Sequence, residues 1–282
     1  MAAPFLAAAV PIGPAGSDPV PMWLAADAGI RIAADAGASL VVLPELFATP
    51  YVAAESPAGW AHLAEPIEGP TTTRMRAAAM ANGIYVLFGM ALREAAGLPF
   101  NTALLARPDG RIEVAARKIH LPPAGDAFGE EHHFIPGAPI VQAVDIAGCK
   151  VAALICYDRR FPECWRAAAA AGADLVAVLV GGPAPDDPEG LYAAELQASA
   201  RANAVYALAA ARYGTETVTG QDVRHDGETI AFDPNGMKIH QHTGPFLVAV
   251  EPDRLAHARD NNATARRLRL PLLTVKEASW LN

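Results

Sequence analysis

A strand that leads directly into a helix is encoded by the stretch Val151-Ala-Ala-Leu-Ile-Cys-Tyr-Asp-Arg-Arg-Phe-Pro-Glu163. Its first five residues are aliphatic, which is typical of a strand buried on both faces. Pro162 suits the first position of a helix, and Glu163 lies beside the positive end of that helix's dipole. Cys156 therefore falls at a strand-to-helix turn, at the carboxyl edge of the predicted sheet.

Short apolar runs alternate with alanine-rich amphipathic stretches along the rest of the chain, which indicates a layered α/β protein. Strands are predicted at Pro4–Val10, Leu40–Leu43, Ile84–Met90, Thr102–Ala106, Ile112–Ala116, Val151–Ile155, Leu175–Leu179, Val205–Ala211 and Phe246–Val250. Helices are predicted at Pro21–Ala36, Thr71–Ala81, Pro162–Ala171 and Gly190–Asn203. Two Pro- and Gly-rich loops, Leu121–Gly137 and Gly181–Gly190, interrupt the alternation, and loops of this length often form a pocket wall or a lid.

The composition excludes several classes of protein. Of the 282 residues, 52% are hydrophobic and 18% are charged. Typical values are about 45–50% and about 25%, so the composition favours a rich core over disorder. The formal net charge of −8 gives the surface no general attraction for nucleic acid or anionic lipid.

The organisation of the chain points to one soluble unit. No repeat of solenoid length and no charged or Ser-rich linker divides it, so we predict a single domain over residues 1–282 with a C-terminal tail from about residue 268. No apolar run reaches the roughly 18 residues of a membrane span, and no basic residue precedes Arg31. We expect a cytoplasmic protein with neither a nucleic-acid partner nor a membrane partner.

One of the three cysteines stands in an unusual setting. Cys149 and Cys164 have the surroundings of small buried hydrophobic residues, and no C-x-x-C pair is present. Cys156, at its strand-to-helix turn, lies where backbone N–H groups can stabilise an oxyanion. The sequence has no P-loop, no G-x-G-x-x-G, no G-x-S-x-G and no H-E-x-x-H motif.

A cysteine nucleophile needs a base and a cation nearby. Leu43-Pro-Glu-Leu-Phe47 places Glu45 directly after a predicted strand. Arg117-Lys-Ile-His-Leu-Pro122 likewise places Lys118 directly after a predicted strand. Taken alone, Glu45 and Lys118 are each equally consistent with a solvated charge at the start of a loop.

Taken together in this order, the three segments resemble the carbon-nitrogen hydrolase family, also called the nitrilase superfamily. The resemblance extends from the first strand to about Arg267. It implies a four-layer αββα sandwich, a homo-oligomer of at least two subunits, and a reaction that uses no metal, nucleotide or organic cofactor. The family's catalytic Glu, Lys and Cys correspond to Glu45, Lys118 and Cys156.

The resemblance also implies a mechanism. Glu45 takes the thiol proton of Cys156, and the sulfur attacks the carbonyl carbon of a small amide-like substrate. Lys118 and the backbone N–H of Tyr157 stabilise the oxyanion. The thioester that results is hydrolysed by water.

Two further residues match positions that recur in the family. A second glutamate near the active lysine corresponds to Glu130, counted back from Pro136-Gly137, with Glu131 as the alternative. Both acids are also compatible with a solvated loop. His120 matches a histidine two residues after the lysine, either as a pocket residue or as a packing residue at the base of the loop.

The residues that follow the nucleophile bear on the substrate. Tyr157-Asp158 resembles the amidase and carbamoylase branches, whereas nitrile-hydrolysing branches usually carry Trp-Glu. Arg159 and Arg160 follow, as in N-carbamoyl-D-amino acid amidohydrolases. In those enzymes arginines at these positions hold the substrate carboxylate, a contact that suits a planar guanidinium. One of the two arginines could instead stabilise the turn through Asp158 or Glu163.

We therefore expect a hydrolase of a carbamoyl or amide C–N bond, most simply in an N-carbamoyl amino acid or another small carboxylate-bearing molecule. Three positions depart from the carbamoylase pattern: Tyr157 replaces an Asn, Gly181-Gly182 replaces Asn-Thr, and Phe128 replaces a His. An aliphatic or ω-amidase is the first alternative. A catalytically silent binding protein on the same fold, or a redox-sensing thiol protein, is the alternative from another class.

Overall fold

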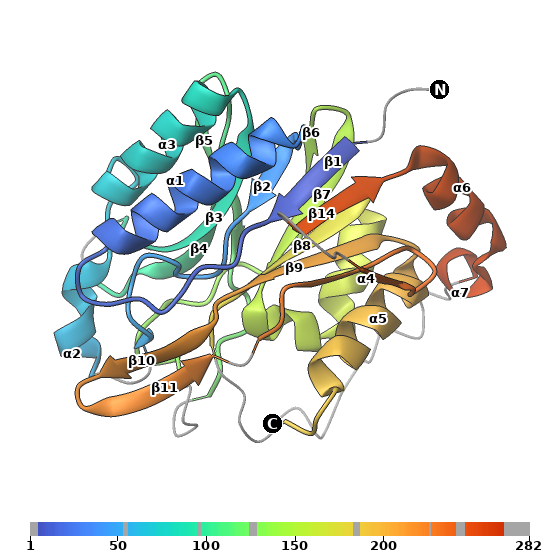
Figure 1. Cartoon of the computed structure of the whole chain (residues 1–282). Coiled ribbons are helices and arrows are strands. Elements are labelled where there is room, and N and C mark those ends of the chain that lie inside the picture. Colours follow the sequence, from blue (N-terminus) through green and yellow to red (C-terminus); the bar gives the residue numbers. More distant parts are fainter. Residues whose placement is uncertain are drawn as a thin grey trace.

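Two six-stranded sheets pack face to face in the middle of the molecule (Figure 1). The computed structural model describes residues 5–52, 56–94, 97–123, 129–182, 187–225, 227–240 and 246–267. The first sheet has the order β14 (Phe246–Val250), β1 (Phe5–Ala9), β2 (Leu40–Val42), β3 (Tyr85–Leu92), β4 (Phe100–Ala106) and β5 (Ile112–Arg117). The second has the order β13 (Lys238–Ile239), β12 (Ile230–Phe232), β9 (Tyr206–Ala211), β8 (Leu175–Val180), β7 (Cys149–Ile155) and β6 (Ala143–Ile146).

Helices form the two outer layers. Helices α1 (Val20–Asp35) and α3 (Pro70–Asn82) cover the first sheet, and α4 (Pro162–Ala170) and α5 (Leu191–Asn203) cover the second. The shorter elements are α2 (Pro57–Trp60), η2 (Ala61–Leu63), η3 (Cys156–Arg160), α6 (Pro252–Asn261), α7 (Ala263–Arg266) and the hairpin of β10 (Gly214–Val218) and β11 (Gln221–His225). The predicted four-layer αββα sandwich is confirmed.

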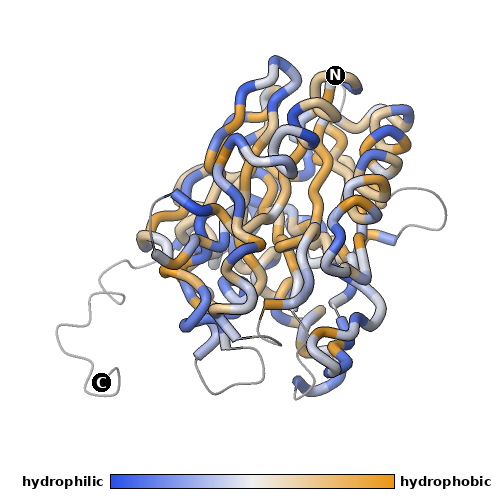
Figure 2. The backbone as a smooth tube through the Cα atoms, turned by 90° about the vertical axis from the view of Figure 1, so that its left-hand side faces the viewer, coloured by the Kyte–Doolittle hydropathy of each residue, from blue (hydrophilic) through white to orange (hydrophobic). Residues whose placement is uncertain are grey.

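Alternation along the strands builds three layers of core. In β7, Val151, Ala153 and Ile155 enter the core between the sheets, whereas Ala152 and Leu154 pack against the helices α4 and α5. In Figure 2 the hydrophobic colours run along the interior strands, while the outer helices alternate between hydrophobic and hydrophilic. A strand that is buried on both faces has no polar side, which explains the continuous aliphatic runs in the sequence.

The strand directions gather several chain segments at one edge. Strands β1, β2 and β3 are parallel, and so are β7, β8 and β9. The carboxyl ends of parallel strands meet at one edge of a sheet, so the segments that follow β2, β7 and β8 lie close together. Glu45, Cys156 and Gly181 begin or lie within these segments.

All nine predicted strands and four predicted helices form, with ends shifted by one or two residues. The sequence did not predict β6, β10 to β13, α2, α6 or α7, because these elements are short or carry many polar residues. Pro4 and the tail from about residue 268 lie outside the described residues. Within the described ranges, no helix combines the length and the apolar character needed to cross a membrane.

The core between the sheets predicts a measurable penalty. Leu105 of β4 is 0% exposed and packs in this core, so Leu105→Ala leaves a cavity and should lower the free energy of unfolding by about 2–5 kcal/mol. Urea unfolding measures the change. Leu24→Ala is the control, because Leu24 is 56% exposed and the same truncation there should change the free energy by less than about 0.5 kcal/mol. Equal effects at both positions would contradict the assignment of the core.

Candidate active site

A buried lysine lies between two buried carboxylates at the edge of the first sheet. Lys118, directly after β5, is 1% exposed, and its Nζ lies 2.8 Å from Glu45 Oε1. The same Nζ donates to both oxygens of Glu130, at 2.8 and 2.9 Å. Glu45 is 1% exposed and Glu130 is 2% exposed, so water screens these charges little. Glu131, the alternative second glutamate, is exposed and is not a member of this cluster.

Charge balance within this cluster changes two protonation equilibria. Burial disfavours the charged form of Lys118, but Glu130 and Glu45 outweigh burial and raise its pKa, so the ammonium persists. Burial raises the pKa of Glu130 to about 7, with Lys118 opposing the rise and Glu45 adding to it. One cation facing two acids therefore leaves Glu130 able to hold a proton near neutral pH.

Cys156 lies on the second sheet's side of the same site. It is the first residue of η3, directly after β7, and its φ of 43° is unusual for a residue with a side chain. Burial and Glu45 raise the pKa of its thiol, whereas Lys118, Arg159 and a hydrogen bond from the Gly182 backbone N–H lower it in part. The thiol is thus protonated at rest, and attack by the sulfur requires a base.

The two oxygens of Glu45 have different environments. Oε1 accepts hydrogen bonds from Lys118 Nζ at 2.8 Å and from Asn101 Nδ2 at 2.7 Å. Oε2 is buried and has no hydrogen-bond partner among the described residues. Since a buried carboxylate oxygen without a donor is costly, Oε2 is the oxygen with capacity to accept a proton. The carboxylate is therefore held by one oxygen and available through the other.

Two glycines make room for Glu45. A Cβ at Gly89 would lie 2.6 Å from Glu45 Cα, and a Cβ at Gly181 would lie 2.9 Å from Glu45 Oε2. Real Cβ atoms do not approach other heavy atoms so closely. The position of Glu45 consequently depends on two glycines, Gly89 in β3 of the first sheet and Gly181 directly after β8 of the second.

Sequence reasoning missed three other residues of the site. Asn101 in β4 donates to Glu45 and, at 3.3 Å, to Glu130 Oε2. Tyr51 is buried, and a Cβ at Gly182 would lie 3.0 Å from its hydroxyl oxygen. Asn is depleted in strands, so an Asn inside the apolar run of β4 was the available signal for Asn101.

Arg212 is the third missed residue. Its Nη2 is 2.9 Å from Glu216 Oε1, and Glu216 also contacts His225, so the group joins β10 to β11. Arg212 Nη1 donates to the carbonyl of Leu46 at 3.4 Å, and Leu46, directly after Glu45, has a φ of 45°. The hairpin thereby supports the strained backbone next to Glu45.

His120 lies at the outer side of the cysteine turn. Its ring stacks on Phe161 with 3.5 Å between centroids, and its Nδ1 is 2.9 Å from Asp158 Oδ1. Asp158 also accepts the backbone N–H groups of Ile119 and His120. This placement fits packing at the base of the loop, and it ties the segment after Lys118 to the turn of Cys156. His120 also lines a cavity with Tyr157 and Phe161, so its place fits a pocket residue as well.

A cluster with metal-ligand chemistry occurs at the same place. Ligand atoms of His120, Asp158 and Cys164 lie within 4.8 Å of one another. The Asp158 carboxylate already accepts from two backbone N–H groups and contacts the imidazole of His120. These contacts account for the carboxylate, so we assign the cluster a structural role.

Arg159 and Arg160 pair with acids that are distant in sequence. Arg159 is buried, with its Nε 3.3 Å from Glu195 Oε2. Arg160 forms an ion pair with Asp187. The neighbouring acids that the sequence offered as partners, Asp158 and Glu163, are not the ones used.

A small cavity opens beside these arginines. It measures about 280 Å³ and includes Gly182, whose N–H donates to the Cys156 sulfur, together with Arg159 and Tyr192. The predicted loop Gly181–Gly190 supplies Gly182, Asp187 and the residues up to Gly190, so its described part forms a wall. The Tyr157 side chain instead lines another cavity, with Phe161 and Glu131.

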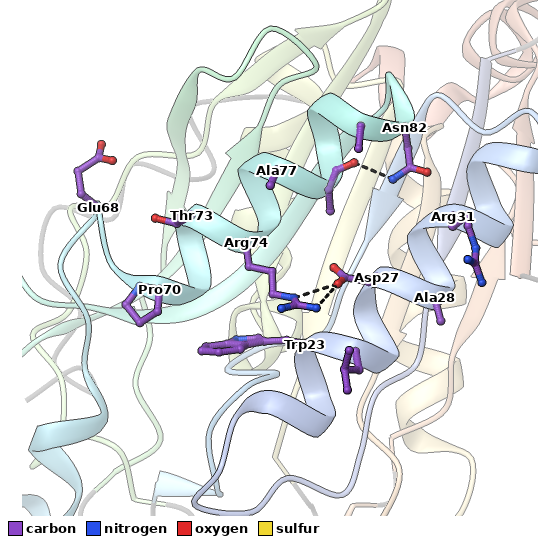
Figure 3. A pocket seen from close by; sticks show the side chains of 13 residues that line it. Trp23, Asp27, Ala28, Arg31, Glu68, Pro70, Thr73, Arg74, Ala77 and Asn82 are labelled. Carbon is purple, nitrogen blue, oxygen red and sulfur yellow. Dashed lines mark hydrogen bonds and ion pairs between the residues drawn. The ribbon is translucent and has the colours of Figure 1, made fainter.

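A groove lies on the outer layer between α1 and α3 (Figure 3). It measures about 990 Å³, and an ion pair between Arg74 and Asp27 crosses it above Trp23. None of the residues that line it belongs to the cluster around Lys118. The groove is therefore separate from the candidate site.

Comparisons with known proteins show the family of the chain. The family model "Carbon-nitrogen hydrolase" matches residues 6–243. The "Hydrolase in pqqF 5'region" of Pseudomonas protegens is 34% identical over 206 residues, which are 72% of this chain and 67% of that protein. The omega-amidase NIT2 of Mus musculus is 36% identical over 52% of this chain, and the match spans about half of that protein, 53%. The solved structure of a mutant Nesterenkonia AN1 amidase from the nitrilase superfamily has a TM-score of 0.74 at 25% identity, over 94% of this chain and 98% of that one.

The cradle around Glu45 predicts that Gly181→Ala lowers kcat by at least about tenfold. The added Cβ would displace the Glu45 carboxylate, and displacements of about 1 Å cost on the order of 10²-fold in rate. Steady-state kinetics and a melting curve measure the effect. Gly16→Ala is the control, since a Cβ there meets nothing within 4 Å. A fully active Gly181→Ala enzyme would show that Glu45 does not need this space.

The pKa of Glu130 predicts a limb in the pH profile of kcat. Activity should rise through about pH 7 in the wild type, because ionised Glu130 holds the Lys118 ammonium with both oxygens. Glu130→Gln should abolish this limb. The effect on stability has the opposite sign. A folded-state pKa above the unfolded value stabilises the protein at acidic pH, and this contribution is lost as the pH rises through about 7. An unchanged limb in Glu130→Gln would assign it to another group.

Proposed function

The chain belongs to the carbon-nitrogen hydrolase family, and from that premise we propose that it hydrolyses the C–N bond of a small carboxamide through a thioester on Cys156. The observation that carries the proposal is the environment of Glu45. One of its oxygens is held by Lys118, the other has no hydrogen-bond partner among the described residues, and its charge raises the pKa of the Cys156 thiol. The omega-amidase and amidase relatives support an amide as the substrate.

Acylation begins with proton transfer. Glu45 Oε2 takes the thiol proton while the Cys156 sulfur forms a bond to the carbonyl carbon of the amide. The carbonyl oxygen becomes an oxyanion, which the Lys118 ammonium and the Tyr157 backbone N–H stabilise. Glu45 then donates its proton to the nitrogen, the C–N bond breaks, and ammonia leaves.

Deacylation repeats these steps with water. Glu45 accepts a proton from a water molecule as the water oxygen bonds to the thioester carbon. The C–S bond then breaks, the sulfur recovers the proton from Glu45, and the carboxylic acid is released. Glu130 keeps Lys118 in place throughout, which makes Glu130 a positioning residue in this scheme.

A carbamoyl substrate is the second candidate. The buried guanidinium of Arg159 lines the small cavity, and a guanidinium can bind the carboxylate of an N-carbamoyl amino acid. The same Glu45, Lys118 and Cys156 chemistry would then act on the ureido carbonyl. Self-association and a cytoplasmic location remain predictions from the sequence.

Loss of the thiol should abolish turnover. Cys156→Ala removes the atom that bonds to substrate, so it should give no ammonia from a panel of small amides and no acyl adduct by intact mass. Cys149→Ala and Cys164→Ala are matched controls, since burial raises the pKa of both thiols to about 12. Activity that survives in Cys156→Ala and disappears in a control would move the nucleophile.

Lys118→Ala and Glu45→Gln should each lower kcat by at least about 10². The first substitution removes an oxyanion donor, and the second removes the proton acceptor. Circular dichroism and melting curves check that the fold survives. A loss of activity that follows a loss of cooperative melting would make the two residues structural.

A further inference from the structure

Both arginines beside the candidate nucleophile already have acidic partners. Asp187 pairs with Arg160 and lies 3.9 Å from Arg159 Nη2. Glu195 of α5 contacts Arg159 Nε at 3.3 Å. A carboxylate that entered the cavity would compete with these acids, because each arginine already has an acid oxygen within about 4 Å.

Two other parts of the Arg159 guanidinium are engaged, whereas its Nε is buried without a hydrogen-bond partner among the described residues. Its Nη1 donates to the carbonyl of Cys156 at 3.1 Å, and its guanidinium carbon lies 4.9 Å from the centre of the Tyr192 ring. These contacts fix the guanidinium against the turn of the nucleophile. Arg159 therefore holds the turn of the nucleophile through Nη1 and through its contact with the Tyr192 ring.

The walls of the cavity carry more acid than base. Asp187 and Glu189 both line it, whereas Arg159 is the basic residue among the described lining residues. A substrate carboxylate in the cavity would meet Asp187, whose side chain is 19% exposed, so water screens the repulsion between these like charges only in part. Glu189 is exposed, and water screens its charge more strongly. A neutral substrate avoids this penalty, and a cationic one gains an acceptor.

We infer that the cavity binds the part of the substrate remote from the scissile amide, and that Asp187 excludes substrates whose remote group is a carboxylate. This inference rests on the proposed amidase function and refines it. It ranks neutral and cationic carboxamides above anionic ones, which reverses the preference that Arg159 and Arg160 indicate in the sequence. Asp187 is on this account a specificity-determining residue, and it acts by neutralising the arginine pair.

Three amides of matched length test the ranking: pentanamide, 5-aminopentanamide and 4-carbamoylbutanoate. In the wild type, kcat/KM for the anionic 4-carbamoylbutanoate should be at least tenfold below that of pentanamide. Asp187→Asn removes the charge that neutralises Arg160, so the ratio of the anionic to the neutral kcat/KM should rise at least tenfold. Asp187→Glu keeps the charge and should keep the ratio low, which separates charge from a loss of folding.

Asp109→Asn is the matched control, because Asp109 pairs with Arg111 on an exposed turn and should leave the ratio unchanged. A wild type that prefers 4-carbamoylbutanoate, or an unchanged ratio in Asp187→Asn, would overturn the inference while leaving the amidase function intact.

Binding of the three amides to Cys156→Ala tests the ranking without turnover. If no amide is hydrolysed, the proposed function fails, and the inference then depends on these affinities alone. Weaker binding of 4-carbamoylbutanoate than of pentanamide would support it, and equal or tighter binding, or no binding of any amide, would overturn it.

Discussion

The whole site depends on one interaction, a lysine ammonium buried between two carboxylates. Lys118 is withdrawn from water, so its charge is tolerable only because Glu45 and Glu130 contact it directly. Burial raises the pKa of Glu130, Lys118 opposes the rise, and the second acid, Glu45, adds to it. Asn101, which donates to both acids, supplies a further dipole toward them. The oxygen of Glu45 that receives no hydrogen bond from any described residue is the part of this arrangement that is available for chemistry.

The fold brings these groups together because several strands end at one edge. Glu45 follows β2, Lys118 follows β5, and Cys156 follows β7, so each residue is fixed by a strand and still free to present its side chain beyond the sheet. Positive φ angles at Leu46 and Cys156 turn the chain sharply where the strands stop. The rigid strands thus fix where these residues lie, and the strained turns fix the direction in which the chain continues.

Much of this was readable from sequence. Aliphatic runs that are buried on both faces predicted the strands, and polar residues directly after three of them predicted where the site lies. Asn101 was missed because a single buried amide inside an apolar run leaves only a faint pattern. The partners of Arg159 and Arg160 were missed for another reason. Asp187 and Glu195 lie 27 or more residues further along the chain. Only tertiary packing brings their loop and their helix beside the turn, so no local sequence pattern indicates these pairs. The hairpin β10–β11 was not predicted either, because a short and polar segment gives no local hydrophobic pattern.

The site straddles the boundary between the two sheets. Glu45 and Lys118 belong to the first sheet, and Cys156 and Gly181 belong to the second, with an apolar core between the two layers behind them. Dispersion and hydrophobic contacts are not directional, so they resist separation of the sheets far better than they resist a small slide of one over the other. The distance between thiol and carboxylate is therefore the dimension of the molecule most sensitive to such a slide. An additional covalent or polar link between the layers, placed away from the site, would lengthen the time for which activity survives at high temperature. It would raise the melting temperature less.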